Sequence, residues 1–223
     1  MYDQIDKNDV KATNQLKDNR YVRFENPGGK GIKVMFAGNS ITLHSVKEEI
    51  GWFNEWGMAA SKKENDYVHI LMDKISDKNP DASFCICQVA PWEVKHGERK
   101  STYDLYDKAK DFEADIIIAR FIENCSRKDC DIETFKKEYC EFLDYLNSHN
   151  NAKIILSTSF WRHPFDKAIE EVAEERNYPL VILGDLGEQD SMKALGLFEH
   201  SGVANHPGDE GMKMIAERIF EQF

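Results

Sequence analysis

Five short apolar runs, separated by segments with helical periodicity, constrain the fold of this chain more than any other feature. Stretches such as 66–72 and 134–146 space their apolar residues three to four positions apart, as an amphipathic helix does. Strands that alternate with helices favour a parallel sheet covered by helices on both faces. We therefore predict a three-layer α/β/α fold with a five-stranded parallel, flavodoxin-like sheet. Its strands are expected at 32–37, 83–88, 115–121, 153–157 and 180–183.

The first 31 residues differ from the rest in being mostly polar. They end in the turn-forming segment Asn26-Pro27-Gly28-Gly29-Lys30-Gly31. Within them, only 20–24 alternates apolar with charged residues, which is the pattern of a short, half-buried strand. We expect residues 1–31 to be an N-terminal extension that adds an edge strand to a main domain at 32–223.

The charge balance restricts the classes of partner. The chain has 40 acidic and 29 basic residues, which give a formal net charge of -11. This balance argues against electrostatic capture of nucleic acid or of an anionic membrane. No apolar stretch approaches the roughly 20 residues that span a bilayer, and the first residues hold no apolar signal core. We expect a soluble, unexported protein with a neutral small-molecule or oligosaccharide substrate; a homo-oligomer is compatible with the sequence.

The cysteines bear on compartment and on metal binding. There are five, an odd number without the spacing of a disulfide framework, so reduced thiols and a cytoplasmic location are expected. Cys125 and Cys130 are spaced poorly for zinc, with no second pair or nearby histidine. We expect neither a metal site nor a cofactor.

Two segments at opposite ends of the chain carry the chemistry. Ser40 follows the first apolar run through a Gly38-Asn39 turn, which places its hydroxyl at the carboxyl edge of the sheet, where open α/β proteins bind ligands. His206 lies in a turn rich in glycine and proline, just before an amphipathic last helix. A serine hydroxyl and a histidine base suggest nucleophilic catalysis of hydrolysis.

These segments resemble the conserved blocks of the SGNH (GDSL-like) hydrolase family, from about Ile32 to the C-terminus. Gly38-Asn39-Ser40 is similar to the first block, Ile122-Glu123-Asn124-Cys125 to the third, and His206-Pro207 with Gly211 to the last. The resemblance implies that Ser40 is the nucleophile and His206 the general base. It further implies three donors to the oxyanion: the Ser40 N–H, the Asn124 side-chain amide, and one N–H from 88–93, which we assign to Glu93.

The chain departs from the family pattern at three places. Val203 occupies the position of the acid three residues before the histidine, Ile122 replaces the glycine of the third block, and the loop 88–93 has no glycine. Three explanations of the missing acid stay open. A backbone carbonyl orients His206 and makes a Ser-His dyad, which we rank first; another carboxylate (Asp185, Glu199 or Asp209) substitutes; or catalysis is lost.

Aromatic residues near the expected site suggest the substrate. The segment 51–61 carries two tryptophans between glycines, which either pack in the core or stack on a sugar ring. Similar tryptophan-bearing loops occur in SGNH proteins that act on carbohydrates. We therefore predict that substrate is bound by Trp52, Trp92, Trp161 and His163, with His44 as a further candidate.

Two functions follow from this interpretation. The first is a serine esterase that hydrolyses short acyl esters, above all O-acetyl esters, on a carbohydrate. The alternative is a non-catalytic carbohydrate or small-ligand binding protein on the same scaffold, which Val203 at the acid position motivates. A nucleotide binder would suit the fold, but no glycine-rich phosphate loop follows the first strand.

Overall fold

The computed structural model describes residues 18–128, 131–149 and 151–223. Its strands are β1 (Val22–Glu25), β2 (Lys33–Gly38), β3 (Ser83–Gln88), β4 (Ile116–Arg120), β5 (Lys153–Ser157) and β6 (Leu180–Val181). Its α-helices are α1 (Tyr67–Lys78), α2 (Ala90–Val94), α3 (Asp107–Asp111), α4 (Ile132–Leu146), α5 (Asp166–Arg176), α6 (Gly184–Gly187), α7 (Ser201–Ala204) and α8 (Asp209–Phe220). Short 3-10 helices lie at Glu48–Ile50, Lys63–Asn65, Arg99–Tyr106 and Asp190–Met192. Within these described ranges, no helix combines the length and the apolar character that crossing a bilayer requires.

The strands form one sheet in the order β1-β3-β2-β4-β5-β6. Strands β2 to β6 are parallel, in the flavodoxin-like order, so the predicted fold class is confirmed. The short strand expected at 20–24 is β1, which pairs antiparallel with β3 at the edge of the sheet. Residues 1–17, the remainder of the expected extension, lie outside the described residues.

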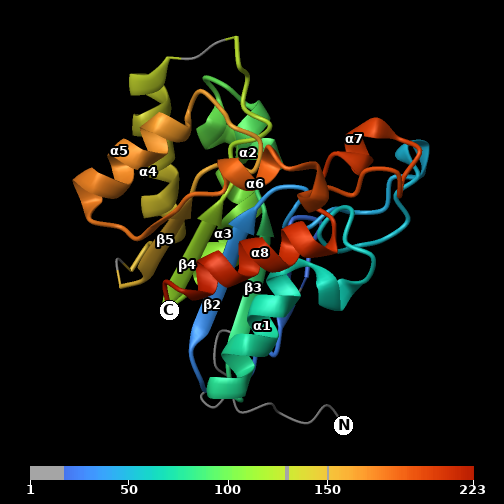
Figure 1. The fold of residues 1–223 in the computed structure, drawn as a ribbon. Helices are drawn as coiled ribbons and strands as arrows, with labels where there is room; N and C mark the ends of the chain where they lie inside the picture. Colours follow the sequence, from blue (N-terminus) through green and yellow to red (C-terminus); the bar gives the residue numbers. More distant parts are fainter. Residues whose placement is uncertain (1–17, 129–130, 150) are drawn as a thin grey trace, which may run out of the picture.

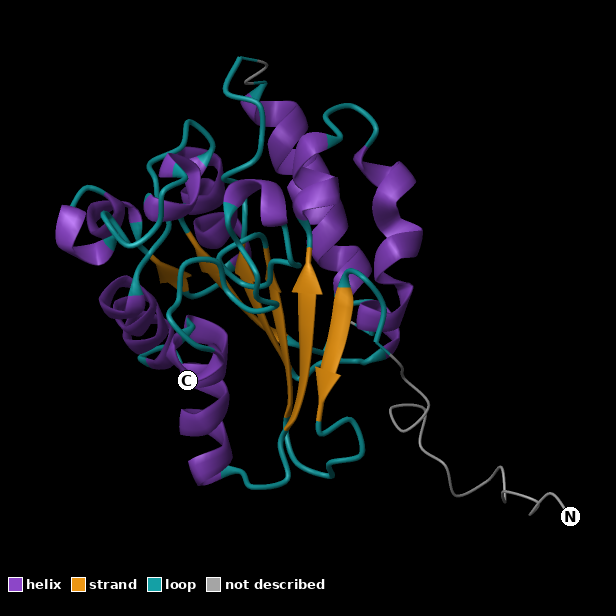
Figure 2. Ribbon diagram, turned by 90° about the vertical axis from the view of Figure 1, so that its right-hand side faces the viewer, coloured by secondary structure: helices purple, strands orange, loops and turns teal. Residues whose placement is uncertain are grey.

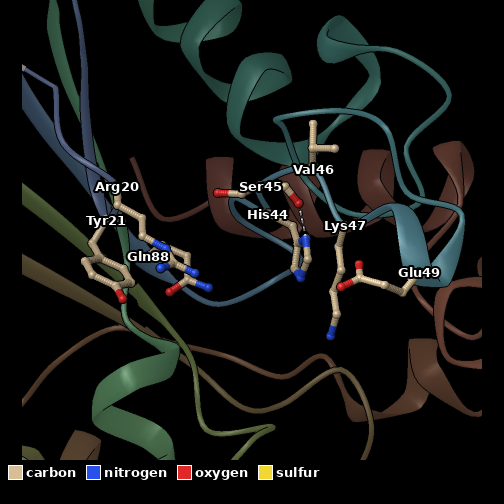
Figure 3. A pocket seen from close by; sticks show the side chains of 8 residues that line it. All are labelled: Arg20, Tyr21, His44, Ser45, Val46, Lys47, Glu49 and Gln88. Atoms are coloured by element: carbon tan, nitrogen blue, oxygen red, sulfur yellow. Dashed lines mark hydrogen bonds between the residues drawn. The ribbon is translucent and has the colours of Figure 1, made fainter.

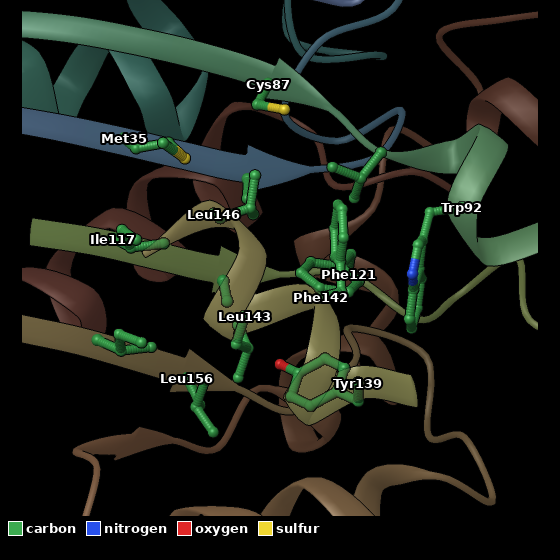
Figure 4. Packing of buried hydrophobic residues seen from close by; sticks show 14 of the residues in the cluster. Met35, Cys87, Trp92, Ile117, Phe121, Tyr139, Phe142, Leu143, Leu146 and Leu156 are labelled. Carbon is green, nitrogen blue, oxygen red and sulfur yellow. The ribbon is translucent and has the colours of Figure 1, made fainter. Parts of the chain in front are cut away.

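Helices cover both faces of the sheet, with α1 and α8 on one side and α3, α4 and α5 on the other (Figures 1 and 2). Helix α1 begins where the Asp66 carboxylate accepts the His69 N–H, and it buries Val68, Leu71 and Ile75 on one stripe. Helix α4 contributes Phe142, which stacks on Trp92 within the apolar layer on the other face of the sheet (Figure 4). This division into two apolar layers follows from the predicted alternation of strands and helices.

The carboxyl end of β2 approaches that of β4 closely because residue 38 is glycine. A Cβ there would lie 1.8 Å from Thr42 Oγ1 and 2.9 Å from the Arg120 carbonyl oxygen. The chain then turns, and the N–H groups of Thr42 and Leu43 donate to the Asn39 carbonyl. This turn places Ser40 at the edge of the sheet where the parallel strands end.

Candidate active site

Ser40 and His206 meet at the carboxyl edge of the sheet. The distance from Ser40 Oγ to His206 Nε2 is 2.8 Å, although the two residues are 166 positions apart in the chain. Ser40 comes from the turn after β2, and His206 from the short connection between α7 and α8. A serine hydroxyl at hydrogen-bond distance from an imidazole nitrogen is the geometry that an activated nucleophile needs.

A backbone carbonyl orients the imidazole of His206. The His206 Nδ1 lies 2.7 Å from the Gly202 carbonyl oxygen. A carbonyl can only accept, so Nδ1 carries the hydrogen and the lone pair of neutral Nε2 faces Ser40 Oγ. The Gly202 carbonyl accepts no bond from the backbone N–H of His206, because that backbone N–H donates instead to the Val203 carbonyl at 2.9 Å. The arrangement matches the dyad that the sequence analysis ranks first.

The three carboxylates considered as substitutes for the acid are placed elsewhere. Asp185 accepts two hydrogen bonds from Arg218, at 2.6 and 2.7 Å. Asp209 accepts from the Ser61 N–H and hydroxyl, at 2.8 and 2.6 Å, and from Asn65. Glu199 lines a separate surface cavity next to His200. None of the three takes the place that the Gly202 carbonyl occupies.

Val203 itself is fully buried in a small apolar cluster with Trp52 and Met58. A carboxylate at position 203 would therefore be placed among apolar side chains, where an unpaired charge is costly. The apolar residue at the acid position thus belongs to the packing of the loop beneath the site.

Changing Asp185, Glu199 and Asp209 one at a time to their amides is expected to leave kcat/KM for an ester within about threefold of wild type, because none of them orients the imidazole. Steady-state kinetics with a thermal melt of each variant measures this. A drop of about three orders of magnitude in a folded variant would identify that carboxylate as a third catalytic group.

Burial sets the ionisation of the candidate base. It lowers the pKa of His206 to about 4; the bond to the Gly202 carbonyl opposes this shift, and the neighbouring His44 adds to it. The imidazole is therefore neutral at neutral pH and able to accept a proton. A base with so low a pKa is weak, which reduces its driving force for proton transfer.

Two of the three expected oxyanion donors are free to act. The Ser40 N–H has no hydrogen-bond acceptor among the described residues. The Asn124 side-chain amide donates one hydrogen to Glu93 Oε2 at 2.6 Å, and its second hydrogen has no acceptor in the described part of the chain. The third donor was assigned wrongly. The Glu93 N–H donates to the Val89 carbonyl in the first turn of α2, so it cannot also bind an oxyanion.

Glu93 instead contributes its carboxyl group to a buried network. Its Oε1 accepts from Asn39 Nδ2 at 3.0 Å, and the same amide donates to Glu123 Oε2 at 2.5 Å. Arg120 donates to Glu123 Oε1 at 2.5 Å and also to Asn39 Oδ1. An aspartate at position 39 could not donate to either carboxylate, so the Gly-Asn-Ser form of the first block suits this network.

The pKa values of the two glutamates of the network are shifted in opposite directions. Burial, together with the negative charge of Glu123, raises the pKa of Glu93. Burial also opposes ionisation of Glu123, but the Arg120 guanidinium and several hydrogen bonds outweigh it and hold the Glu123 pKa below its usual value. The sequence analysis did not assign roles to Arg120 and Glu123. One feature of the sequence could have pointed to such roles: Arg120 is a charged residue at the end of an apolar strand, and a buried charge needs a partner.

Ile122 keeps a backbone conformation that favours glycine. Its φ is 154°, although its side chain is fully buried in the core. Non-glycine residues adopt such angles only where surrounding packing holds them, and such residues cluster at functional sites. The packing around Ile122 thus holds a strained turn two residues before Asn124.

Three of the four predicted substrate-binding residues belong to the core, and those predictions are wrong. Trp52 and Trp92 are 0% exposed. Trp52 packs in the cluster with Val203, and Trp92 lies among Phe121, Phe142 and other aromatic rings (Figure 4). His163 is also buried, with its Nε2 3.2 Å from the Cys125 carbonyl oxygen and its Nδ1 accepting the Phe165 N–H. The two indoles are buried by apolar packing, whereas the His163 ring is held by its two hydrogen bonds to the backbone.

Trp161 and His44 do lie beside the serine and histidine pair. The centroids of the Trp161 and His206 rings are 5.0 Å apart in an edge-to-face arrangement, and Trp161 Nε1 donates to the Asn205 carbonyl. His44 follows Ser40 by four residues, and it lies near enough to His206 to contribute to the lowering of its pKa. Both side chains are partly exposed, so both can contact a bound substrate.

In the comparisons with known proteins, no protein-family model matches the chain, and no curated protein matches it either. Solved structures do resemble it. A two-domain esterase active on acetylated mannans is 17% identical with a TM-score of 0.54; the match covers 86% of this chain and 49% of that one, so this chain spans about half of its length. The psychrotrophic esterase EstA from Pseudoalteromonas sp. is 13% identical with a TM-score of 0.55, covering 85% and 94%. A protein of the lipolytic G-D-S-L family from Desulfitobacterium hafniense is 16% identical with a TM-score of 0.50, covering 86% and 99%. At these identities the likeness shows the fold, which is that of the SGNH hydrolases.

Proposed function

We propose that this protein is a serine esterase that removes short acyl groups, above all O-acetyl groups, from a carbohydrate by means of a Ser40-His206 dyad. The observation that carries the proposal is the 2.8 Å contact between Ser40 Oγ and His206 Nε2. The Gly202 carbonyl supports it, because it selects the tautomer in which Nε2 can accept a proton. The SGNH fold, with this pair at the carboxyl edge of its sheet, suits the same chemistry.

In the first half of the proposed reaction, Ser40 Oγ attacks the carbonyl carbon of the ester while its proton passes to His206 Nε2. The tetrahedral intermediate then collapses, the bond to the alcohol oxygen breaks, and the imidazolium returns the proton to the leaving alcohol. In the second half a water attacks the acyl-serine in the same way and releases the acid. The Gly202 carbonyl stabilises the imidazolium through a neutral dipole rather than a full negative charge, so turnover should be modest.

The Ser40 N–H and the second hydrogen of the Asn124 amide would stabilise the oxyanion. For the third donor we propose the Ala90 N–H, because in the loop 88–93 it is held by a side chain, Gln88 Oε1 at 3.1 Å. A side chain can rotate away when a substrate binds, whereas the backbone acceptors of its neighbours are fixed in secondary structure.

The preference for a carbohydrate ester rests on two observations. The partly exposed indole of Trp161 lies beside His206, and a flat apolar surface at that place can pack against a sugar ring. The two-domain esterase of similar fold acts on acetylated mannans. Both favour an acetylated sugar as the ester.

The test of this function is a panel of esters that differ in acyl length. We expect kcat/KM for p-nitrophenyl acetate to exceed that for the octanoate by about tenfold or more, which is a difference that a pocket shaped for a small group can produce. Release of acetate from acetylated oligosaccharides, followed by an enzyme-coupled assay, measures the natural class of substrate. A preference for the octanoate would contradict a short-acyl esterase.

A non-catalytic binding protein remains the second candidate, and the apolar, buried Val203 at the acid position is the observation that favours it. Under that function, an acetylated oligosaccharide would bind to the wild-type protein and remain intact. Calorimetric binding followed by mass spectrometry of the recovered sugar separates the two functions, because only an esterase releases the acetyl group.

A further inference from the structure

A cavity of about 390 Å³ lies at the carboxyl edge of the sheet, where its lining residue Gln88 ends β3 next to Gly38 of β2. Its walls include Arg20, Tyr21, His44, Lys47, Glu49 and Gln88. Figure 3 shows His44 between two groups of side chains, with Arg20, Tyr21 and Gln88 on one side and Lys47 and Glu49 on the other. Gly38 lies two residues before Ser40 and His44 four residues after it, so the cavity lies at the same edge of the sheet as the proposed nucleophile. Its volume is within the range of small-molecule sites.

Two cations face this cavity without a carboxylate partner. Neither Arg20 nor Lys47 forms a salt bridge within the described part of the chain, whereas the nearby Arg23 pairs with Glu55 at 2.9 Å. Glu49 lines the same cavity but does not come within salt-bridge distance of Lys47 in the described residues. In a chain with a net charge of -11, this is a local site where an anionic group would be attracted.

The neutral groups of the cavity suit hydroxyl groups. The His44 Nδ1 lies 2.6 Å from the Ser45 carbonyl oxygen, so Nδ1 donates and leaves Nε2 as an acceptor. Burial lowers the pKa of His44, which keeps its imidazole neutral. The Gln88 amide nitrogen adds a donor on the opposite wall, while the Gln88 Oε1 accepts the Ala90 N–H (Figure 3). Alternating donors and acceptors of this kind bind the hydroxyls of a sugar.

We propose that this cavity binds the alcohol part of the substrate, and that this part is a sugar carrying an anionic group. The anion lies against the Arg20 guanidinium, whose planar fork fits a carboxylate or a phosphate, and Lys47 adds a second positive charge. The inference rests on the proposed esterase function, which by itself requires no charge on the substrate.

The experiment compares three acetyl esters of closely related alcohols: acetylated glucose, acetylated glucuronate and acetylated glucose 6-phosphate. For wild type we expect kcat/KM to be about tenfold higher for one or both anionic esters than for the neutral ester, as a charge-assisted contact provides. The preference should shrink at high ionic strength. The carboxylate and phosphate arms show which anion the site selects.

The variants give effects of opposite sign. Arg20→Gln should remove most of the anionic preference and Lys47→Gln part of it, while Glu49→Gln should increase it by removing a like charge. The quantity to compare is the ratio of kcat/KM for the anionic ester to kcat/KM for the neutral ester, because the alcohol parts of both esters occupy the same cavity. Lys137→Gln, which removes one exposed positive charge from α4 on the other face of the sheet, is the matched control and should change neither rate.

Equal rates on all three esters, or a preference that survives Arg20→Gln combined with Lys47→Gln, would overturn the inference and leave the esterase function intact. If no ester is hydrolysed, the esterase function fails instead. The anionic site is then judged by calorimetric binding of the same three sugars to the wild-type protein and the double variant. Equal affinity for the neutral and the anionic sugars would overturn it there too.

Discussion

Ser40→Ala is expected to lower kcat for p-nitrophenyl acetate by about 10⁴-fold or more, since removing the nucleophile of a serine hydrolase costs four to six orders of magnitude. The variant keeps the backbone N–H and the Asn124 amide, so a small residual rate above that of water should remain. The only hydrogen bond of the Ser40 hydroxyl within the described residues is to His206.

The loss should therefore be one of chemistry and leave the fold intact. We expect the thermal midpoint of Ser40→Ala to lie within about 2 °C of wild type, because a partly exposed hydroxyl contributes little to stability. Ser101→Ala removes an exposed hydroxyl far along the chain and serves as the matched control, with unchanged kcat. Turnover near the wild-type rate in Ser40→Ala would exclude Ser40 from the mechanism.

His206→Ala is the second large effect, and we expect kcat to fall by about 10³-fold or more, because the serine then has no base within hydrogen-bond distance. His149→Gln replaces an exposed histidine in the turn after α4 and should leave the rate unchanged. A rate within tenfold of wild type in a folded His206→Ala variant would show that another group removes the Ser40 proton.

The pKa of His206 predicts how kcat/KM depends on pH. The base acts only when neutral, and burial lowers the pKa of His206 to about 4. As the pH falls, kcat/KM should therefore stay constant through the range where an exposed histidine titrates and should decline only near pH 4. Circular dichroism at each pH separates this decline from unfolding. A midpoint at the ordinary histidine pKa would show that the imidazole is solvated in the working enzyme.

The sequence by itself determined the layers of the fold, and it indicated that the segments around Ser40 and His206 come together. Apolar periodicity is a local property, so it located β3 and β5 at the residues expected and alternated them with helices. Once a parallel sheet is implied, the carboxyl ends of its strands must share an edge, which brings Ser40 to that edge before any contact is known. His206 could be placed by its resemblance to a family block, because that block is short and contiguous and can therefore be recognised in the sequence.

Tertiary structure alone decided which polar groups pair and which aromatic residues are buried. Trp161 and Trp92 are equally apolar, and only packing places one beside His206 and the other inside the core. Likewise, the Gly202 carbonyl became the partner of His206 because the turn after α7 leaves it free, and a main-chain carbonyl has no signature in the sequence. The free energy of burial and of hydrogen bonding depends on what surrounds a group in three dimensions, which a linear pattern does not specify.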